Sequence, residues 1–136
     1  MIRINIVCVG KIKEKYIKDG IEEFLKRLSK YAKLDIIELS EEDDNKGVKN
    51  AIDIETERII NIIEKKNYSY NILLDLSGKM LTSVEMAQKI EKISLTNSEI
   101  NFIIGGSNGV DDELRKLVDF RLAFSSFTFP HQLMRL

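Results

Sequence analysis

Short apolar runs alternate with amphipathic segments from one end of this sequence to the other. The runs have the length and composition of buried strands, and we predict strands at 2–9, 34–39, 72–75, 101–104 and 122–124. The segments between them repeat apolar residues at the i, i+3, i+4 spacing of an amphipathic helix. Regular alternation of strand and helix predicts one α/β domain over residues 1–136, with a mainly parallel sheet.

Each predicted helix has an apolar stripe that we expect to face the sheet. In the first helix the stripe comprises Ile17, Gly20, Ile21, Phe24, Leu25 and Leu28. In the second helix, predicted to end near Lys66 and Asn67, it comprises Ile52, Thr56, Ile59, Ile60 and Ile63. In the third it comprises Ala87, Ile90 and Ile93, and a fourth helix is predicted to begin at Asp111.

Turn and capping residues mark several boundaries between these elements. The acidic residues 40–47 predict a solvated loop, and Ser77 with Gly78 predicts a turn. Residues 82–85 fit the S/T-x-x-E capping box, which starts a helix. Pro130 suits the first turn of a last helix, because a missing N–H needs no partner there.

Composition narrows the class of protein. A chain of 136 residues suits one domain with its own core, and 43% apolar with 32% charged residues is ordinary for a soluble protein. No apolar run approaches the roughly 20 residues that span a bilayer, and the N-terminus lacks the features of a signal peptide. The single cysteine, Cys8, rules out a disulfide framework, is expected to be a buried packing residue, and favours a cytoplasmic location.

The net charge of −1 conceals an uneven distribution. Residues 1–33 contain nine Lys or Arg against four Asp or Glu, whereas residues 34–57 contain two against nine. A basic field over the whole protein, of the kind that holds nucleic acid, is therefore not expected. The basic N-terminal segment is better explained from charge alone as a solvated helix face.

The last third of the chain carries the most chemistry. One predicted strand leads into the glycine-rich loop 105–109, and the next opens onto residues 125–131, which are small hydroxyls and aromatics. In an open parallel sheet, ligands bind in the crevice outside the carboxyl ends of the strands. The sequence therefore predicts a small-molecule pocket formed by these two loops.

Each loop also has a purely structural explanation. The glycine loop fits neither G-x-G-x-x-G nor a Walker motif, so a simple strand-to-helix turn is equally consistent with it. In the second loop, aromatic and hydroxyl side chains suit a flat heteroaromatic ligand, but the aromatics are equally consistent with core packing and the serines with a turn. The residues concerned are Phe124, Ser125, Ser126, Phe127, Thr128 and Phe129.

Nucleophilic and metal chemistry receive less support from the residues. His131 is the only histidine, which argues against histidine-rich metal sites, and no metal ligand set is predicted. A serine nucleophile on a G-x-S-x-G elbow is absent from the sequence. Asp75 is the one carboxylate expected at a strand end facing the crevice. The residues by themselves thus predict a ligand-binding α/β domain and leave its reaction open.

Four separated motifs resemble one known family, the bacterial large-subunit ribosomal RNA pseudouridine N3-methyltransferases of the SPOUT class. The motifs are residues 7–16 (VCVGKIKEKY), 73–79 (LLDLSGK), 102–109 (FIIGGSNG) and 124–135 (FSSFTFPHQLMR). The match covers essentially the whole chain, with these motifs in the family's order and spacing. The resemblance implies a mainly parallel sheet with helices on both faces and a trefoil knot near the C-terminus.

The resemblance also implies a function and a set of site residues. The expected reaction transfers a methyl group from S-adenosylmethionine to N3 of a pseudouridine in 23S ribosomal RNA within the ribosome. By position in the motifs, the cofactor contacts would be Leu74, Gly105, Phe124, Ser125, Ser126, Phe127, Thr128 and Phe129. His131 is a candidate for the base that removes the N3 proton, although a role in orienting the last helix fits it equally well.

Family members further imply a homodimer whose RNA site uses both subunits. Lys11, Lys13, Lys15 and Arg135 are the candidate phosphate contacts. Family members continue past the position of Leu136 through an amphipathic helix and a tail, so we expect this chain to be a truncated form with an incomplete knot. Two other functions remain open: an adenosine-binding module, and a ribosome-binding protein without turnover.

Overall fold

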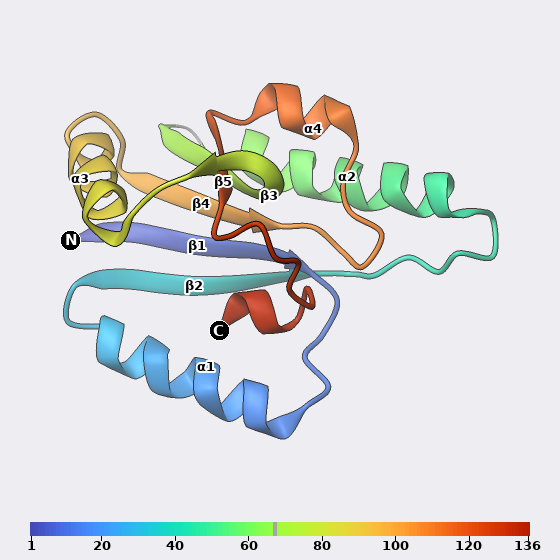
Figure 1. The fold of residues 1–136 in the computed structure, drawn as a ribbon, viewed down its shortest axis with the longest axis horizontal. Coiled ribbons are helices and arrows are strands. Elements are labelled where there is room, and N and C mark those ends of the chain that lie inside the picture. The colour runs from blue at the N-terminus through green and yellow to red at the C-terminus, as the bar shows by residue number, and fades with distance from the viewer. Residues whose placement is uncertain (67) are drawn as a thin grey trace.

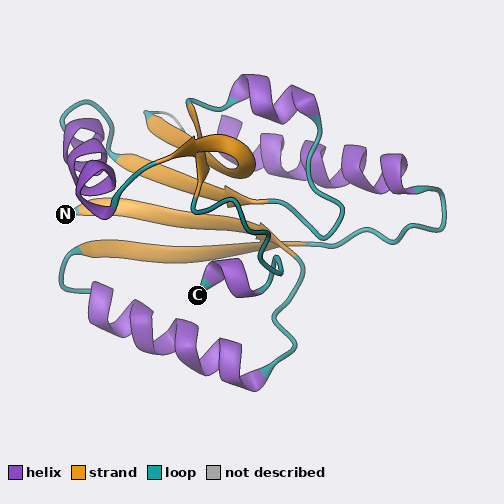
Figure 2. Ribbon diagram, in the orientation of Figure 1, coloured by secondary structure: helices purple, strands orange, loops and turns teal. Residues whose placement is uncertain are grey.

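The computed structural model describes residues 1–66 and 68–136, and within them strands and helices alternate as predicted (Figures 1 and 2). The elements are β1 (Ile2–Val9), α1 (Lys15–Leu28), β2 (Ala32–Leu39), α2 (Val48–Glu64), β3 (Ser69–Met80), α3 (Ser83–Ser94), β4 (Glu99–Ile104), α4 (Asp112–Leu117), β5 (Phe120–Ala123) and a 3-10 helix, η1 (Leu133–Arg135). None of the helices in this described part is long and apolar enough to cross a membrane.

The five strands form one sheet in the order β2-β1-β4-β3-β5, and all four pairings are parallel. Helices α2 and α4 pack on one face and α3 packs on the other. Helix α1 lies along β2 at the sheet's edge (Figure 1). The α/β class with a parallel sheet and helices on both faces is confirmed, while the trefoil knot stays a prediction.

Alternation of side chains along each strand divides the core in two. Val7, Leu73 and Ile103 point to one face, where Ile59 of α2 and Leu114 of α4 cover them. Ile72, Ile100 and Leu122 point to the other face and pack against Ile93 of α3. Both faces of the central strands are therefore apolar, which is why the sequence reads there as continuous apolar runs.

A ladder of asparagines crosses the three central strands and was not predicted. Asn5 donates from Nδ2 to Oδ1 of Asn101 at 2.8 Å, and Asn101 donates to Oδ1 of Asn71 at 2.9 Å. These residues are in register, with Asn101 opposite both of the others. Since a one-residue slip would leave buried amides unpaired, the ladder helps to define the register.

Strand β3 is longer than predicted and contains the bend that forms one wall of the site. Leu74 and Lys79 both pair with Leu122 of β5, so the four residues between them bulge out of the ladder. The predicted turn lies within this bulge, where the Ser77 amide donates to the Asp75 carboxylate at 3.1 Å. A Cβ on Gly78 would lie 2.6 Å from the backbone of Arg121, so only glycine fits there.

Several helix predictions need correction. The buried face of α2 includes Ala51 and Glu55, while Ile52 and Ile60 are only partly buried. Ala87 of α3 is exposed, and Met86 packs on the core in its place. In each case the buried stripe is displaced around the helix from the predicted one, because periodicity locates a stripe but not its centre.

Some predictions of helix ends are confirmed and others need correction. Helix α2 ends at Glu64, before the predicted end at Lys66, and Asn67 lies outside the described residues. The predicted capping box of α3 is confirmed, since the Thr82 hydroxyl accepts from the Glu85 amide and the Glu85 carboxylate accepts from the Thr82 amide. The predicted last helix is only the 3-10 turn at Leu133–Arg135.

The stripe predicted for α1 is also only partly buried. Ile17 and Ile21 are buried, but Phe24 and Leu28 are each 45% exposed. Gly20 lies against Leu136, which a Cβ at this position would meet at 2.8 Å. The C-terminal segment therefore packs on part of α1, while Phe24 and Leu28 in the second half of that helix remain partly exposed to solvent.

Candidate functional site

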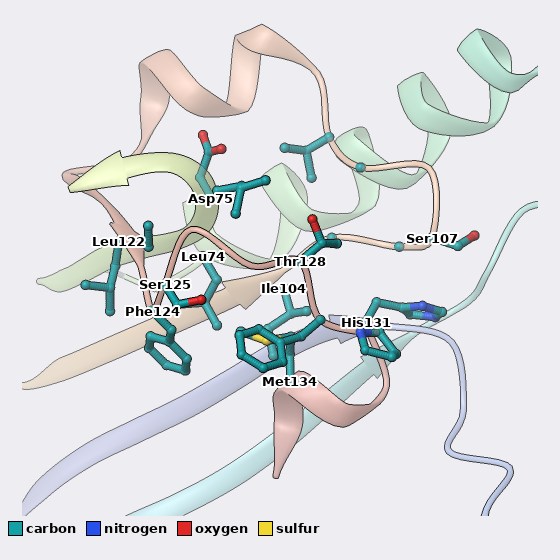
Figure 3. Close-up of a pocket in the computed structure, with 18 of the residues that line it drawn as sticks. Leu74, Asp75, Ile104, Ser107, Leu122, Phe124, Ser125, Thr128, His131 and Met134 are labelled. Atoms are coloured by element: carbon teal, nitrogen blue, oxygen red, sulfur yellow. The ribbon is translucent and has the colours of Figure 1, made fainter. Parts of the chain in front are cut away.

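The two predicted loops meet at the carboxyl ends of β3, β4 and β5 and enclose a cavity of about 710 Å³ (Figure 3). Its walls come from the β3 bend, the glycine loop, the start of α4, the end of β5 and the C-terminal segment. The lining residues include Leu74, Asp75, Leu76, Ile104, Gly105, Gly106, Ser107, Gly109, Val110, Arg115, Leu122, Ala123, Phe124, Ser125, Phe127, Thr128, Phe129, Pro130, His131 and Met134. The cavity has the size and mainly apolar lining of a small-molecule site.

The glycine loop is a tight turn and a wall of the cavity at once. The Gly109 amide donates to the Gly106 carbonyl at 3.0 Å, and Gly109 has a φ of +88°, which favours glycine. A Cβ on Gly105 would lie 2.6 Å from Cγ1 of Val110, so the missing side chain permits the close fold of the loop. Asp111 then caps α4 by accepting from the Glu113 amide.

The second loop presents its aromatic rings to the surface instead of the core. Phe124 is 58% exposed, Phe127 is 80% exposed and Phe129 is 42% exposed, so the core-packing explanation is wrong. The Ser125 hydroxyl accepts from the Phe127 amide at 2.8 Å, which forms the turn that aims this segment across the cavity. Ser126 is exposed and is not among the residues that line the cavity.

The carboxylate predicted to face the crevice, Asp75, lies in an ionic cluster. Its Oδ2 accepts from Nε of Arg115 at 3.1 Å and from Nη1 of Arg121 at 3.5 Å. Burial alone would raise the pKa of Asp75, but hydrogen bonds from Ser77 and the Arg115 guanidinium bring it below its ordinary value. Asp75 is thus a fixed anion that joins the β3 bend to α4 and β5.

His131 lines the cavity at the end where the C-terminal segment passes β1 (Figure 3). Partial burial lowers the pKa of His131, and the nearby cations Arg135 and Lys13 lower it further, while Glu41 opposes them. The imidazole is therefore neutral at pH 7 and can accept a proton.

We expect the pKa of His131 to lie below its ordinary value of 6.5 in an NMR titration of the imidazole protons. His131 is the only histidine in the chain, so its signals are unambiguous. Glu41→Gln should lower the pKa again, because the carboxylate that favours the charged form is gone. A wild-type pKa at or above 6.5 would contradict this picture of a partly buried, neutral imidazole.

The prediction that Arg135 contacts RNA phosphate is corrected by its surroundings. Its side chain is only 1% exposed, and Nη1 donates to Oε2 of Glu38 at 2.8 Å. Nη2 donates to the carbonyls of Val9 and Gly10 at 2.8 and 2.7 Å. A guanidinium that is engaged in this way anchors the C-terminal segment to the end of β1 and cannot reach a phosphate.

The other candidate phosphate contacts are on the surface. Lys11, Lys13 and Lys15 are exposed, and the ammonium group of Lys15 is 3.0 Å from the Asp19 carboxylate. The Lys13 amide donates to the Gln132 side chain at 3.2 Å, so this basic segment lies next to the C-terminal segment. Their role in RNA binding stays a prediction.

Two charged residues near the cavity were missed at the sequence level. Arg115 lines the cavity, but in the sequence it is simply one of two basic residues in the last turn of α4. Glu55 is 3% exposed, and a Cβ on Gly106 would lie 2.6 Å from its Oε1. The burial of Glu55 raises its pKa. Neither residue has a motif around it that gives a signal, because both depend on loops that are distant in sequence.

Within the part of the chain that the structure describes, no three His, Cys, Asp or Glu side chains come together as metal ligands would. Cys8 is fully buried, and burial raises the pKa of its thiol to about 11. A thiol with that pKa is almost entirely protonated at neutral pH, so Cys8 is a packing residue as predicted.

Comparison with known proteins bears directly on this site. A family profile described as "Predicted SPOUT methyltransferase" matches residues 2–136, nearly the whole chain. The chain belongs to the SPOUT methyltransferase family. SPOUT methyltransferases in general use S-adenosylmethionine, and the residues here suit such a ligand: an apolar cavity, exposed backbone at the glycine loop, and one anion and one cation in the wall.

Individual SPOUT methyltransferases resemble the chain over the same range. The protein named ribosomal RNA large subunit methyltransferase H in Fusobacterium nucleatum is 53% identical over 134 residues, which is 98% of this chain and 86% of that protein. The protein of the same name in Clostridioides difficile (strain 630) is 51% identical over 137 residues, again 98% and 86% of the two chains. A putative member in Methanococcus maripaludis is 45% identical over 138 residues, or 97% and 86%.

Proposed function

We propose that this chain transfers a methyl group from S-adenosylmethionine to N3 of a pseudouridine in large-subunit ribosomal RNA. The observation that carries the proposal is the cavity, because the two loops that form it are the loops that resemble the cofactor site of the family. Relatives with about half of their residues identical are named as large-subunit ribosomal RNA methyltransferases. The matched range includes both loops, since the match covers 98% of the chain.

The proposed cofactor contacts come from three elements. Leu74 at the β3 bend offers an apolar surface, and Gly105 lines the cavity with backbone alone, because it has no side chain of its own. The remaining proposed contacts follow β5: Phe124, Ser125, Ser126, Phe127, Thr128 and Phe129. Of these, only Ser126 lies away from the cavity wall, so its contact would need the loop to adjust.

The chemistry asks little of the protein beyond alignment and removal of one proton. The bound sulfonium supplies an activated methyl group, so the protein's task is to hold the acceptor nitrogen in line with it. The N3 proton of the base has to leave, and the neutral imidazole of His131 is the proposed acceptor.

RNA and a second subunit complete the proposal. The exposed lysines at positions 11, 13 and 15 lie beside the C-terminal segment and are proposed to contact phosphates. A homodimer is proposed because Phe124 and Phe127 stand exposed at the mouth of the cavity, where a partner would cover them. Two modest basic patches brought together in this way reinforce each other. Sedimentation velocity tests the dimer.

The test is transfer of radiolabelled methyl from S-adenosylmethionine to ribosomes that lack the modification, with ribosomes that already carry it as the control. We expect label in the large-subunit RNA of the unmodified ribosomes only, and 3-methylpseudouridine in its nucleoside digest. Binding of S-adenosylhomocysteine without any transfer would instead support an adenosine-binding module. Ribosome binding without transfer would support a non-catalytic ribosomal protein.

A further inference from the structure

The charged groups in the cavity wall are few and are grouped together. Among the described residues that line it, Arg115 is the one permanent cation and Asp75 the one carboxylate. Both lie on the side of the cavity that is formed by the β3 bend and α4, and Figure 3 shows Asp75 between Leu74 and α4. The other lining residues are apolar side chains and glycines, together with the hydroxyls of Ser107, Ser125 and Thr128 and the imidazole of His131. The carboxylate and the permanent cation therefore lie together at one end of the cavity.

The guanidinium of Arg115 is held in place by two carboxylates and still has unused donors. Nε donates to Oδ2 of Asp75 at 3.1 Å, and Nη1 donates to Oδ1 of Asp112 at 2.8 Å. These bonds use two of its five N–H groups, and the described residues offer no acceptor to Nη2. Its side chain is 32% exposed and lines the cavity, where a ligand would meet it.

The guanidinium of Arg115 stays protonated at neutral pH. Burial alone would lower the pKa of Arg115, but the carboxylates of Asp112 and Asp75 raise it above its ordinary value. A fixed, planar cation with free N–H groups in a cavity wall is suited to a carboxylate, which it can bind through charge-assisted hydrogen bonds.

We propose that Arg115 binds the carboxylate at the amino-acid end of S-adenosylmethionine. Arg115 thereby makes the cavity select adenosyl compounds that keep the whole amino acid. This inference rests on the proposed function, because it assumes that the cavity binds an adenosyl ligand. Asp75 acts as the positioning residue, since its carboxylate fixes the guanidinium against the β3 bend.

Arg121 supplies a matched control. It also donates to Oδ2 of Asp75, at 3.5 Å, and it carries the same charge. However, Arg121 is not among the residues that line the cavity, and its side chain is 43% exposed to solvent. If the two arginines served only to neutralise Asp75, replacing either one would change the affinity for the ligand to a similar extent.

The experiment measures the affinities of two probes by calorimetry: S-adenosylhomocysteine, which has the carboxylate, and 5′-methylthioadenosine, which lacks the amino acid. We expect the wild-type protein to prefer the first probe. Arg115→Met should weaken the binding of S-adenosylhomocysteine by about 10- to 100-fold, which is the contribution of hydrogen bonds to a charged group. The affinity for 5′-methylthioadenosine should not change. Arg115→Lys should retain part of the preference, and Arg121→Met should retain all of it.

The ratio of the two affinities separates this inference from a structural role. Partial unfolding of a variant weakens both probes by the same factor, so an equal loss for both with Arg115→Met would overturn the inference. Equal effects of Arg115→Met and Arg121→Met on the ratio would also overturn it. Wild-type protein that binds both probes equally would refute the role of Arg115 while leaving the adenosyl site intact. Binding of neither probe would refute the proposed function itself.

Discussion

Arg135→Met is expected to lower the free energy of unfolding by about 2–4 kcal/mol, because it leaves two buried carbonyls without donors. The guanidinium of Arg135 donates to the carbonyls of Val9 and Gly10 and to the Glu38 carboxylate, and its side chain is 1% exposed. Methionine fills much of the same space but supplies no hydrogen bond. Urea denaturation followed by circular dichroism measures the difference.

Glu38→Gln is the control for this prediction. The Glu38 side chain is 41% exposed, so its charge is well solvated and the ion pair itself should contribute less than about 1 kcal/mol. An amide oxygen still accepts from Arg135, and the two carbonyls keep their donor. If Arg135→Met proved as stable as wild type and lost only RNA binding, the structural role would be refuted and the phosphate contact would be restored.

Gly105→Ala is expected to weaken binding of S-adenosylhomocysteine about tenfold or more. A Cβ at this position would lie 2.6 Å from Cγ1 of Val110 and 3.3 Å from the Gly109 carbonyl, so the loop must move. Overpacking of this kind costs about 1–3 kcal/mol. Since Gly105, Gly109 and Val110 all line the cavity, that strain is relieved at the expense of the binding site. Calorimetric titration gives the affinity.

Two further variants identify the cause of the loss. Val110→Ala removes the methyl group that collides, so the double variant should recover much of the affinity that Gly105→Ala loses. Lys116→Ala changes an exposed residue of α4 that is not among those lining the cavity, and this variant should bind within about twofold of wild type, as surface changes usually leave it. Wild-type affinity in Gly105→Ala would show that the loop tolerates a side chain and that its close fold is not needed.

The sequence was sufficient for features that depend on neighbouring residues. Alternating apolar runs and amphipathic stripes predicted the parallel α/β sheet, because burial on both faces of a central strand demands continuous apolar residues. The capping box at Thr82 and Glu85 was predicted for the same reason, since both partners lie within one helical turn. The two loops of the cavity followed from the rule that parallel strands deliver their carboxyl ends to one edge.

Phase errors in the predicted helices have a simple origin. Periodicity locates an apolar stripe but not its centre, so Ala87 was placed inward although Met86 packs on the core. Phe24 was expected to be buried and is 45% exposed, because α1 lies along the outer strand of the sheet and has little to pack against. The sequence pattern shows which residues are apolar, whereas the neighbouring strands and helices determine which of those residues are buried.

Tertiary structure alone decided the polar contacts that shape the site. Arg135 and Glu38 are 97 positions apart, and Arg115 and Asp75 are 40 apart, so no local pattern pairs them. The β3 bulge likewise exists only against β5, where Leu122 faces both Leu74 and Lys79. Local spacing therefore determined the elements, their order and the two loops of this protein. The partners of each buried charge depended on strand register and crossover geometry, which bring distant residues within hydrogen-bonding distance only in the folded chain.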